Sequence, residues 1–276
     1  MNVHHIIQQI EKTDPDFVER VDTRRSAMKE FAGIAGKLAL AAVPLALGGM
    51  FKKAYGRQAG NSLFDILNYA LTLEYLEAKF YQMGSASSGL IPSGAPTMAI
   101  QTIGAHETAH VNFLRTAITA AGGTPVSEPT FDFTAGGAFS NVFGSYATFL
   151  AVAQTFEDTG VRAYKGQAAQ ASLMANNDVL TAALNIHSVE ARHASHIRQM
   201  RKANGFGDVK PWITGKETGI GAAVQASYDG EEITSQAGVE IVNINGQSIS
   251  AAAASEAFDE PLSMQQVLDI VSPFIA

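Results

Sequence analysis

The chain has 276 residues, of which 46% are hydrophobic and 16% charged, and this balance is typical of a globular protein with one sizeable core. Its formal net charge of −7 and scattered basic residues argue against a nucleic-acid partner, which needs a concentrated basic face. The sequence contains no cysteine, so any metal site must use oxygen and imidazole ligands, which suit iron, manganese or zinc.

The N-terminal segment, residues 1–60, carries a pattern that predicts export. Residues 23–29 read TRRSAMK and precede an apolar run from Phe31 to Phe51 that only Lys37 interrupts. This pattern resembles a twin-arginine export signal, which is set aside before the fold is considered. We expect a periplasmic or otherwise exported protein. The alternatives are an uncleaved membrane anchor and a cytoplasmic chain that buries this segment as a helix.

Four helical patterns follow the N-terminal segment. Apolar residues recur at helical intervals over residues 61–83, 96–121, 142–171 and 177–204. Glycines mark the expected ends of three of these segments, at Gly84, Gly122 and Gly205. Residues 124–140 contain two prolines and a glycine pair, which predicts the long connection needed between parallel helices. The sequence therefore predicts an all-α four-helix bundle over residues 61–206.

Residues 207–276 are rich in small side chains, and we expect them to form an extension packed on the bundle. The segment from Val239 to Ile244 is rich in apolar side chains that alternate with polar ones, and Asn245-Gly246 follows it. This order is a signal for a β-hairpin with its turn at the Asn-Gly pair. Residues 261–274 are predicted to form a last helix.

An internal repeat relates the first two helices to the last two. In each half, two glutamates stand 33 residues apart, and a histidine follows the second glutamate three residues later. The residues repeated in this way are Glu74, Glu107 and His110, and then Glu157, Glu190 and His193. One Glu-x-x-His is common on a solvated helix face. Two of them, each preceded at the same distance by a helical glutamate, predict a shared site.

The spacing supplies the donor groups of a metal site. Residues i and i+3 project from nearly the same helix face, so the glutamate and histidine can bind one metal ion or two adjacent ones. Two such helices face one another with two imidazoles and two carboxylates able to bridge, and the lone glutamates close the outer sides. Four buried carboxylates without cations would repel one another. We therefore predict two metal ions per chain, ligated by the six repeated residues.

Two further pairs of residues occupy matched positions in the repeat. Tyr81 and Tyr164 follow the lone glutamates by seven residues, and they are candidates for hydrogen bonds to opposing ligand carboxylates. Simple core packing is the alternative for both tyrosines. Arg115 and Arg198 follow the second glutamates by eight residues, and we expect them at the surface or near a helix end.

Other titratable residues lack this regularity. Glu77 competes with Glu74 as a ligand, but the repeat places Gly160 opposite Glu77 and Glu157 opposite Glu74. Glu77 is therefore left out of the predicted ligand set. Three histidines without the doubled spacing are expected to be structural or solvated: His106, His187 and His196.

The order Glu, Glu-x-x-His, Glu, Glu-x-x-His resembles the ferritin-like superfamily over roughly residues 61–204. Residues 73–81 (LEYLEAKFY), 105–111 (AHETAHV) and 257–262 (AFDEPL) are similar, more narrowly, to the ferritin-like group that contains desiccation-related proteins. The resemblance implies a ferritin-like four-helix bundle with a di-metal site held by the six repeated residues. It also implies iron as the preferred metal, with manganese as the alternative.

The resemblance says less about activity, because the superfamily includes iron oxidation and storage, peroxide reduction, hydrocarbon oxidation and dismutation of peroxide. We expect a di-iron oxidoreductase that reacts with oxygen or peroxide like a ferroxidase or peroxidase and serves in stress protection. The alternatives are a manganese catalase-like activity and a non-catalytic, structural or stress-protective metal-binding protein. No catalytic residue is assigned beyond the metal ligands. The long connection and the C-terminal tail disfavour a storage cage, whereas a homodimer is compatible with both.

Overall fold

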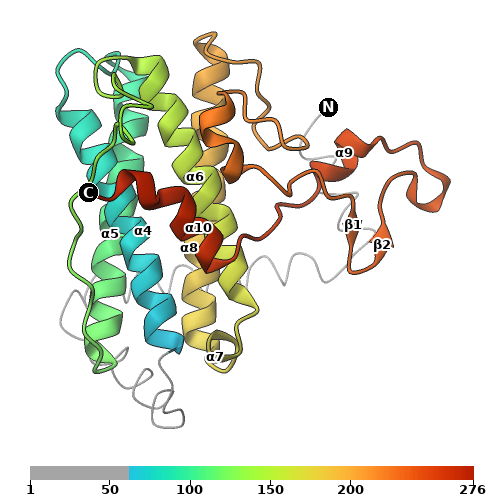
Figure 1. Cartoon of the computed structure of the whole chain (residues 1–276), viewed down its shortest axis with the longest axis horizontal. Helices are drawn as coiled ribbons and strands as arrows, with labels where there is room; N and C mark the ends of the chain where they lie inside the picture. Colours follow the sequence, from blue (N-terminus) through green and yellow to red (C-terminus); the bar gives the residue numbers. More distant parts are fainter. Residues whose placement is uncertain (1–61) are drawn as a thin grey trace, which may run out of the picture.

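The computed structural model describes residues 62–276, so the expectations for the export signal and anchor lie outside the described residues. The four longest helices of this range pack side by side as a bundle (Figure 1). They are α4 (Ser62–Ala86), α5 (Ala95–Ala120), α6 (Tyr146–Ala168) and α8 (Asn177–Ala203). The prediction of an all-α four-helix bundle is confirmed.

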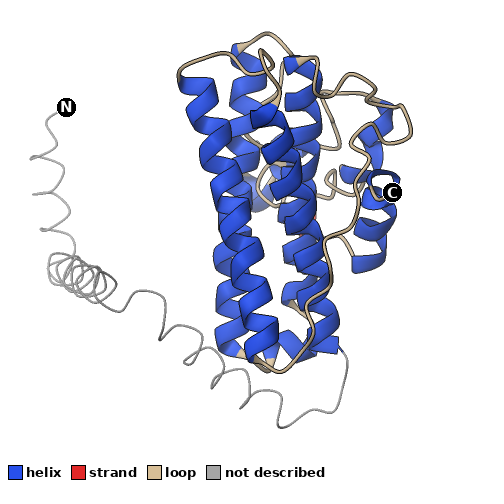
Figure 2. Cartoon of the chain, turned by 90° about the vertical axis from the view of Figure 1, so that its left-hand side faces the viewer, coloured by secondary structure: helices blue, strands red, loops and turns tan. Residues whose placement is uncertain are grey.

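The connection between α5 and α6, residues 121–145, follows the length of the bundle (Figure 2). It must do so because α5 and α6 run in the same direction, whereas α4 and α8 run in the opposite one (Figure 1). A short connection cannot join two helices that run in the same direction. The long crossover expected from the prolines and glycines of this segment is therefore present.

Side-chain caps explain where the later helices begin. The Ser145 hydroxyl accepts a hydrogen bond from the Thr148 N–H at the start of α6, and the Asn176 side chain accepts one from the Val179 N–H at the start of α8. Each cap satisfies a backbone donor that has no partner within the helix. Between them, the short helix α7 (Ala171–Met174) turns the chain from α6 back into α8.

Helix α4 does not end at Gly84, where the sequence predicts a stop, but continues to Ala86. A Cβ atom at position 84 would lie 2.3 Å from the ring of Phe149 on α6. Gly84 therefore permits the close packing of α4 against α6, and it does not terminate the helix. The Phe149 ring in turn stacks on Phe80, with ring centroids 4.7 Å apart and an interplanar angle of 8°.

The apolar core is divided into two clusters along the bundle axis. On α5, Ile100 and Ile103 belong to one cluster, whereas Val111 and Leu114 belong to the other. The predicted ligands of α5 occupy the stretch between them. On α8, Ile186 belongs to one cluster and Ile197 to the other, and the predicted ligands lie between them. The middle of the bundle is therefore a polar layer with apolar side chains on both sides.

The C-terminal tail consists of short elements. They are η1 (Ala222–Ser227), β1 (Ser235–Gln236), β2 (Val239–Glu240), η2 (Ile244–Gly246), α9 (Ala251–Ser255), α10 (Met264–Val271) and η3 (Ser272–Phe274). Helix α10 carries a capping box in which Ser263 and Gln266 exchange hydrogen bonds. The last helix of the sequence prediction is thus present, although it is shorter than residues 261–274.

The predicted hairpin with a turn at Asn245-Gly246 is wrong. The two short antiparallel strands, β1 and β2, enclose Ala237-Gly238 instead, and Asn245-Gly246 lies in the η2 turn. Ala237 and Gly238 both have positive φ angles, of 50° and 82°. Positive φ angles at both central residues are typical of two-residue hairpin turns. The hairpin turn is therefore made by Ala237-Gly238 and not by Asn245-Gly246.

The tail is anchored to the bundle by polar contacts. The Arg162 guanidinium on α6 lies 2.7 Å from Glu231 and donates a 2.6 Å hydrogen bond to the Ser227 carbonyl oxygen. At the chain end, the Asp132 N–H donates to the Phe274 carbonyl oxygen at 2.9 Å, which joins the C-terminus to the crossover connection. Figure 1 shows α10 lying across the bundle.

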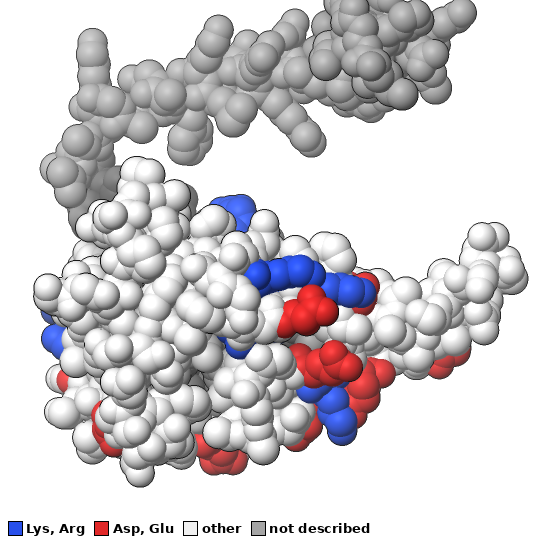
Figure 3. Space-filling model, turned by 90° about the horizontal axis from the view of Figure 1, so that it is seen from above, with Lys and Arg blue, Asp and Glu red and all other residues white. Residues whose placement is uncertain are grey.

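Within residues 62–276, no helix combines the length and apolar character needed to span a bilayer. On the face drawn in Figure 3, a short row of basic side chains lies directly beside acidic side chains.

Candidate metal centre

The six residues of the sequence repeat lie together in the middle of the bundle. Each of the four long helices contributes to the cluster, because α4 and α6 supply one glutamate each and α5 and α8 supply one Glu-x-x-His each. All four of the glutamates are 0% exposed: Glu74, Glu107, Glu157 and Glu190. Glutamates are rarely buried this completely unless cations or ion pairs offset their charge.

The cluster forms two overlapping groups of ligand atoms. One group contains Glu74 and His110, the other contains Glu157 and His193, and both groups contain Glu107 and Glu190. In each group the atoms that can bind a metal ion lie within 4.8 Å of one another. The two groups share two carboxylates, and each is a set of atoms that could hold a metal ion.

Both imidazoles face the carboxylates through Nδ1. His110 Nδ1 lies 3.1 Å from Glu74 Oε2 and 3.1 Å from Glu107 Oε2. His193 Nδ1 lies 2.8 Å from Glu107 Oε1 and 3.2 Å from Glu157 Oε2. The His110 side chain is 13% exposed, so solvent reaches the cluster at this histidine.

Two tyrosines support the outer carboxylates from the opposite half of the repeat. The Tyr81 hydroxyl on α4 donates a hydrogen bond to Glu157 Oε1 on α6, and the Tyr164 hydroxyl on α6 donates one to Glu74 Oε1 on α4. All four side chains are buried. Each tyrosine thus fixes one carboxylate oxygen and leaves the other oxygen facing the cluster.

Three of the four carboxylates and both histidines of the cluster have raised pKa values, whereas for Glu107 the hydrogen bonds of His110 and His193 outweigh burial and lower the pKa to about 2. Burial raises the pKa of Glu74 to about 8, and it also raises the pKa values of Glu157 and Glu190. Burial lowers the pKa of His110, but its hydrogen bonds to the carboxylates outweigh burial and raise this pKa to about 12. Burial also lowers the pKa of His193, but its contacts with the charged carboxylates of Glu157 and Glu107 together outweigh burial and raise this pKa to about 10. Metal ions that bind here must displace the protons that groups with raised pKa values retain.

The unpaired atoms of the cluster fit a pair of metal ions. Among residues 62–276, Glu190 Oε2 has neither a hydrogen-bond partner nor an ion-pair partner, while Glu190 Oε1 and Glu157 Oε2 lack a hydrogen bond and have only a histidine Nδ1 at 3.4 and 3.2 Å. A buried acceptor without a donor is costly. Since carboxylate oxygens and imidazole nitrogens are ligands for iron and manganese, cations at the two positions would satisfy these atoms.

Glu77 lies beside the centre, although the sequence analysis left it out. It is 3% exposed, and no hydrogen bond or ion pair joins its carboxylate to another described residue. A Cβ atom on Gly160 would lie 3.3 Å from Glu77 Oε1 and 3.2 Å from Glu190 Oε2. Gly160 stands on α6 at the repeat position that Glu77 occupies on α4. Because Gly160 has no side chain, the Glu77 carboxylate has room beside it. Glu77 belongs to neither group of ligand atoms, and it makes the two halves of the centre unequal.

His106 also contacts the centre, contrary to the expectation that it is only structural or solvated. Its Nδ1 lies 3.0 Å from His193 Nε2, and the two rings stack with centroids 5.2 Å apart. Because Val189 stands at the matched position of the repeat, the doubled pattern gave no indication of this contact. Of the other histidines, His187 Nδ1 bonds the backbone of α6 and His196 is exposed.

Arg198 was expected at the surface or near a helix end, but its side chain lies inside the protein. It is buried and makes a two-pronged ion pair with Asp158, with N–O distances of 3.0 and 2.5 Å. The Tyr228 hydroxyl donates a further 2.7 Å hydrogen bond to Asp158. Arg115, at the matched position of the other half, is exposed as expected. Arg198 therefore joins α8 to α6 next to the ligand position Glu157.

A family model described as a ferritin-like domain matches residues 62–203. This range contains the four long helices and all six residues of the cluster. Neither the curated proteins nor the solved structures contain a match to the chain.

Proposed function

Because the chain belongs to the ferritin-like family, we propose that its buried centre binds two iron ions and reacts with dioxygen or peroxide, as a ferroxidase or peroxidase does. The observation that carries this proposal is the sharing of Glu107 and Glu190 between two groups of ligand atoms. A shared pair of carboxylates holds two metal ions close enough to act on one small molecule.

A redox-active metal pair supplies two electrons, which with two protons convert dioxygen into hydrogen peroxide or hydrogen peroxide into two water molecules. The protein residues orient the ligands for this chemistry. Tyr81 and Tyr164 hold the outer carboxylates in place. If His193 held a metal ion through Nδ1, its proton would stay on Nε2, and His106 Nδ1 would accept that hydrogen bond and fix the ring.

The choice of iron over manganese rests on the family, because the ligand chemistry does not distinguish the two metals. Four carboxylates and two imidazoles also suit manganese, and a manganese-loaded centre would favour a catalase-like dismutation of peroxide. A third outcome is a metal pair that stabilises the bundle without turnover, because metal binding to a folded site adds to folding stability. Loading with each metal distinguishes these three functions.

The decisive experiment is anaerobic loading with ferrous iron, followed by exposure to dioxygen or to hydrogen peroxide. We expect oxidation of two iron ions per chain, together with consumption of the oxidant, and no such reaction in Glu107→Ala. Disproportionation of peroxide by the manganese-loaded protein alone would favour the catalase-like function. Tight metal binding without any reaction would favour the structural function.

We also propose that the protein acts outside the cytoplasm, on the basis of the TRRSAMK pattern at residues 23–29. Twin-arginine export suits a protein that acquires its metal ions before transport, because that route carries folded proteins. Cell fractionation of the full chain and of an Arg24→Lys, Arg25→Lys variant tests this proposal. Retention of the variant in the cytoplasm supports export, whereas an unchanged distribution contradicts it.

A further inference from the structure

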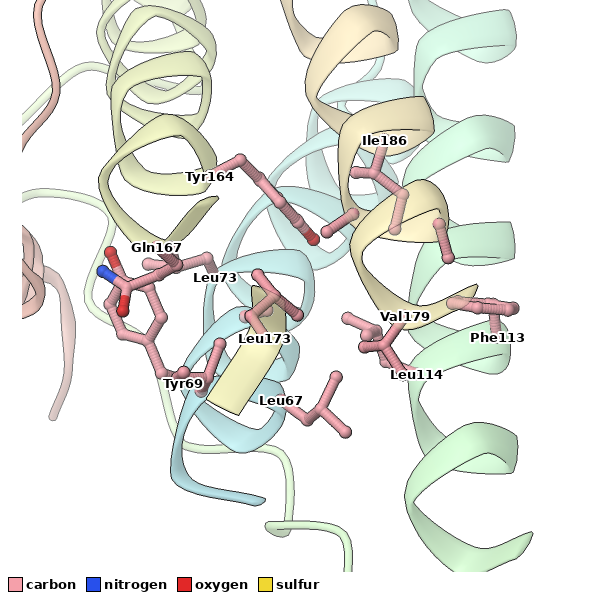
Figure 4. Close-up of a pocket in the computed structure, with 14 residues that line it drawn as sticks. Leu67, Tyr69, Leu73, Phe113, Leu114, Tyr164, Gln167, Leu173, Val179 and Ile186 are labelled. Atoms are coloured by element: carbon pink, nitrogen blue, oxygen red, sulfur yellow. The ribbon is translucent and has the colours of Figure 1, made fainter. Parts of the chain in front are cut away.

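A small apolar cavity lies between the bundle helices and α7, on the α7 side of the metal centre (Figure 4). Its volume is about 30 Å³, and almost all of the atoms on its inner surface are apolar. Residues from all four long helices and from α7 line it, among them Leu67, Leu114, Leu173 and Val179. These side chains belong to the apolar cluster on that side of the centre.

The cavity lies about one helical turn from the metal ligands. Ala70 precedes Glu74 by four residues and Ile186 precedes Glu190 by four residues, and both Ala70 and Ile186 line the cavity. Four residues of helix correspond to about 6 Å along the axis. Tyr164 makes the connection direct, because its ring lines the cavity and its hydroxyl bonds Glu74. A molecule in this cavity therefore has only one layer of side chains to pass.

Size restricts the occupant to a very small molecule. A volume of about 30 Å³ exceeds the roughly 10–15 Å³ that a single water needs, but it is far below the roughly 150 Å³ of a cavity that holds benzene. A diatomic gas or a noble-gas atom fits these limits. A fatty chain or an aromatic substrate does not.

Polarity restricts the occupant further. A buried water needs two to four polar partners, whereas an apolar cavity stays dry. Among the described residues that line the cavity, only Tyr69 and Gln167 have a buried polar side-chain atom without a hydrogen-bond partner. Figure 4 shows both side chains on one side of the cavity, opposite Phe113. Hydrogen peroxide needs hydrogen bonds on all sides and is disfavoured, whereas dioxygen, an apolar molecule, is favoured.

We propose that this cavity binds dioxygen and delivers it to the metal centre, so that dioxygen and hydrogen peroxide reach the centre by different routes. The inference rests on the proposed function, since it concerns the oxidant of that same centre. The outer side of the cavity is formed by Phe113, Ala182 and Ala183, which are all partly exposed. Dioxygen enters there, between α5 and α8, whereas polar oxidants reach the centre at the solvent-exposed edge of His110.

Xenon binding and oxidation rates test this proposal on the same variants. Ala183→Leu adds three carbon atoms at the partly exposed outer wall and fills the cavity. Ala120→Leu, a partly exposed alanine of α5 that does not line the cavity, is the matched control. We expect xenon density in pressurised crystals of the wild type and of the control, but none in Ala183→Leu. The oxidation of bound ferrous iron by dioxygen should slow several-fold in Ala183→Leu only, while oxidation by hydrogen peroxide stays unchanged.

Three results would overturn the proposal: no xenon in the wild-type cavity, equal dioxygen rates in all variants, or equal slowing with peroxide. Metal content and melting temperature are measured for each variant, and Ala182→Leu replaces Ala183→Leu if the latter loses metal or unfolds. Xenon in the cavity of a protein that reacts with neither dioxygen nor hydrogen peroxide would show that the proposed function itself has failed, and the delivery role with it, whereas reaction with peroxide alone would overturn only the delivery role. Unaffected dioxygen oxidation without xenon would show that only the cavity inference is wrong.

Discussion

The hydroxyl of Tyr164 on α6 donates a hydrogen bond to Oε1 of Glu74 on α4. Tyr81 and Glu157 make the same contact in the opposite direction, from α4 to α6. The two halves of the repeat therefore hold each other's outer carboxylate. This exchange links the duplication in the sequence to the shape of the candidate centre, because neither half orders its own glutamate.

Tyr164→Phe should weaken metal binding while the bundle remains folded. The substitution removes the hydrogen bond that orients Glu74, and loss of such a supporting contact typically lowers metal affinity about 10-fold or more. Competition with a chelator of known affinity measures the change.

Tyr69→Phe is the control for this effect. The Tyr69 hydroxyl is also buried, but it has no hydrogen-bond partner among residues 62–276. Its removal should leave the metal affinity unchanged. Equal affinities of the wild type and Tyr164→Phe would show that the tyrosine only fills space.

His106→Ala should weaken the metal position that His193 serves more than the one that His110 serves. The Nδ1 atom of His106 lies 3.0 Å from His193 Nε2, and its loss frees the ring to rotate. We expect two unequal steps in a metal titration of the variant and a partial recovery in His106→Gln, whose amide can accept the same hydrogen bond. His196→Ala removes an exposed histidine of α8 and should titrate like the wild type. Identical titrations of His106→Ala and His196→Ala would contradict this role.

Arg198→Met should destabilise the protein much more than Arg115→Met, although the two arginines occupy matched positions in the repeat. The first change leaves Asp158 buried without its cation, which costs about 3–5 kcal/mol. The second removes an exposed side chain, where changes usually stay within about 0.5 kcal/mol. Denaturant unfolding of both variants measures the difference. Similar unfolding free energies would mean that the Arg198 pair contributes little.

The metal-free protein should become less stable as the pH rises from about 5 to about 8. Burial raises the pKa of Glu74 from 4.5 in the unfolded chain to about 8 in the folded one. Between these values the folded state keeps a proton that the unfolded state has lost, so a rising pH favours unfolding. The raised pKa of His110 acts in the same direction above pH 6.5. Melting temperatures across this pH range measure the trend.

Metal ions should reverse that trend, because they replace the retained protons. The rise in melting temperature on metal loading should therefore grow with pH. In Glu74→Gln the pH dependence of the metal-free protein should be weaker, since one of the titrations within this window is removed. A metal-free wild type that gains stability between pH 5 and pH 8 would contradict the protonation of the cluster.

The bundle and its six clustered residues follow from the sequence because they depend on local periodicity. A glutamate and a histidine three residues apart share a helix face whatever surrounds them, and the equal interval of 33 residues brings two such pairs to one level. The long crossover was predictable for a similar reason, since two prolines and a glycine pair exclude a fifth long helix there.

Other features depend on contacts between distant segments and were not predictable. Gly84 looks like a helix end, but it is required by the Phe149 ring of another helix. Arg198 has the same sequence context as Arg115, and only the tail residue Tyr228 and the α6 residue Asp158 explain its burial. The place of Glu77 could have been inferred from Gly160, because a missing side chain opposite a carboxylate leaves room for it.

The measurement that tests the central claim most directly is the metal-to-chain ratio of the purified protein, by elemental analysis, in the wild type and in a His110→Ala, His193→Ala double variant. The variant removes one ligand from each metal position and keeps the four buried glutamates. We predict two iron or manganese ions per wild-type chain and their loss from the double variant. No stoichiometric metal in the wild type after anaerobic loading, or an unchanged ratio in the variant, would contradict the metal centre described above.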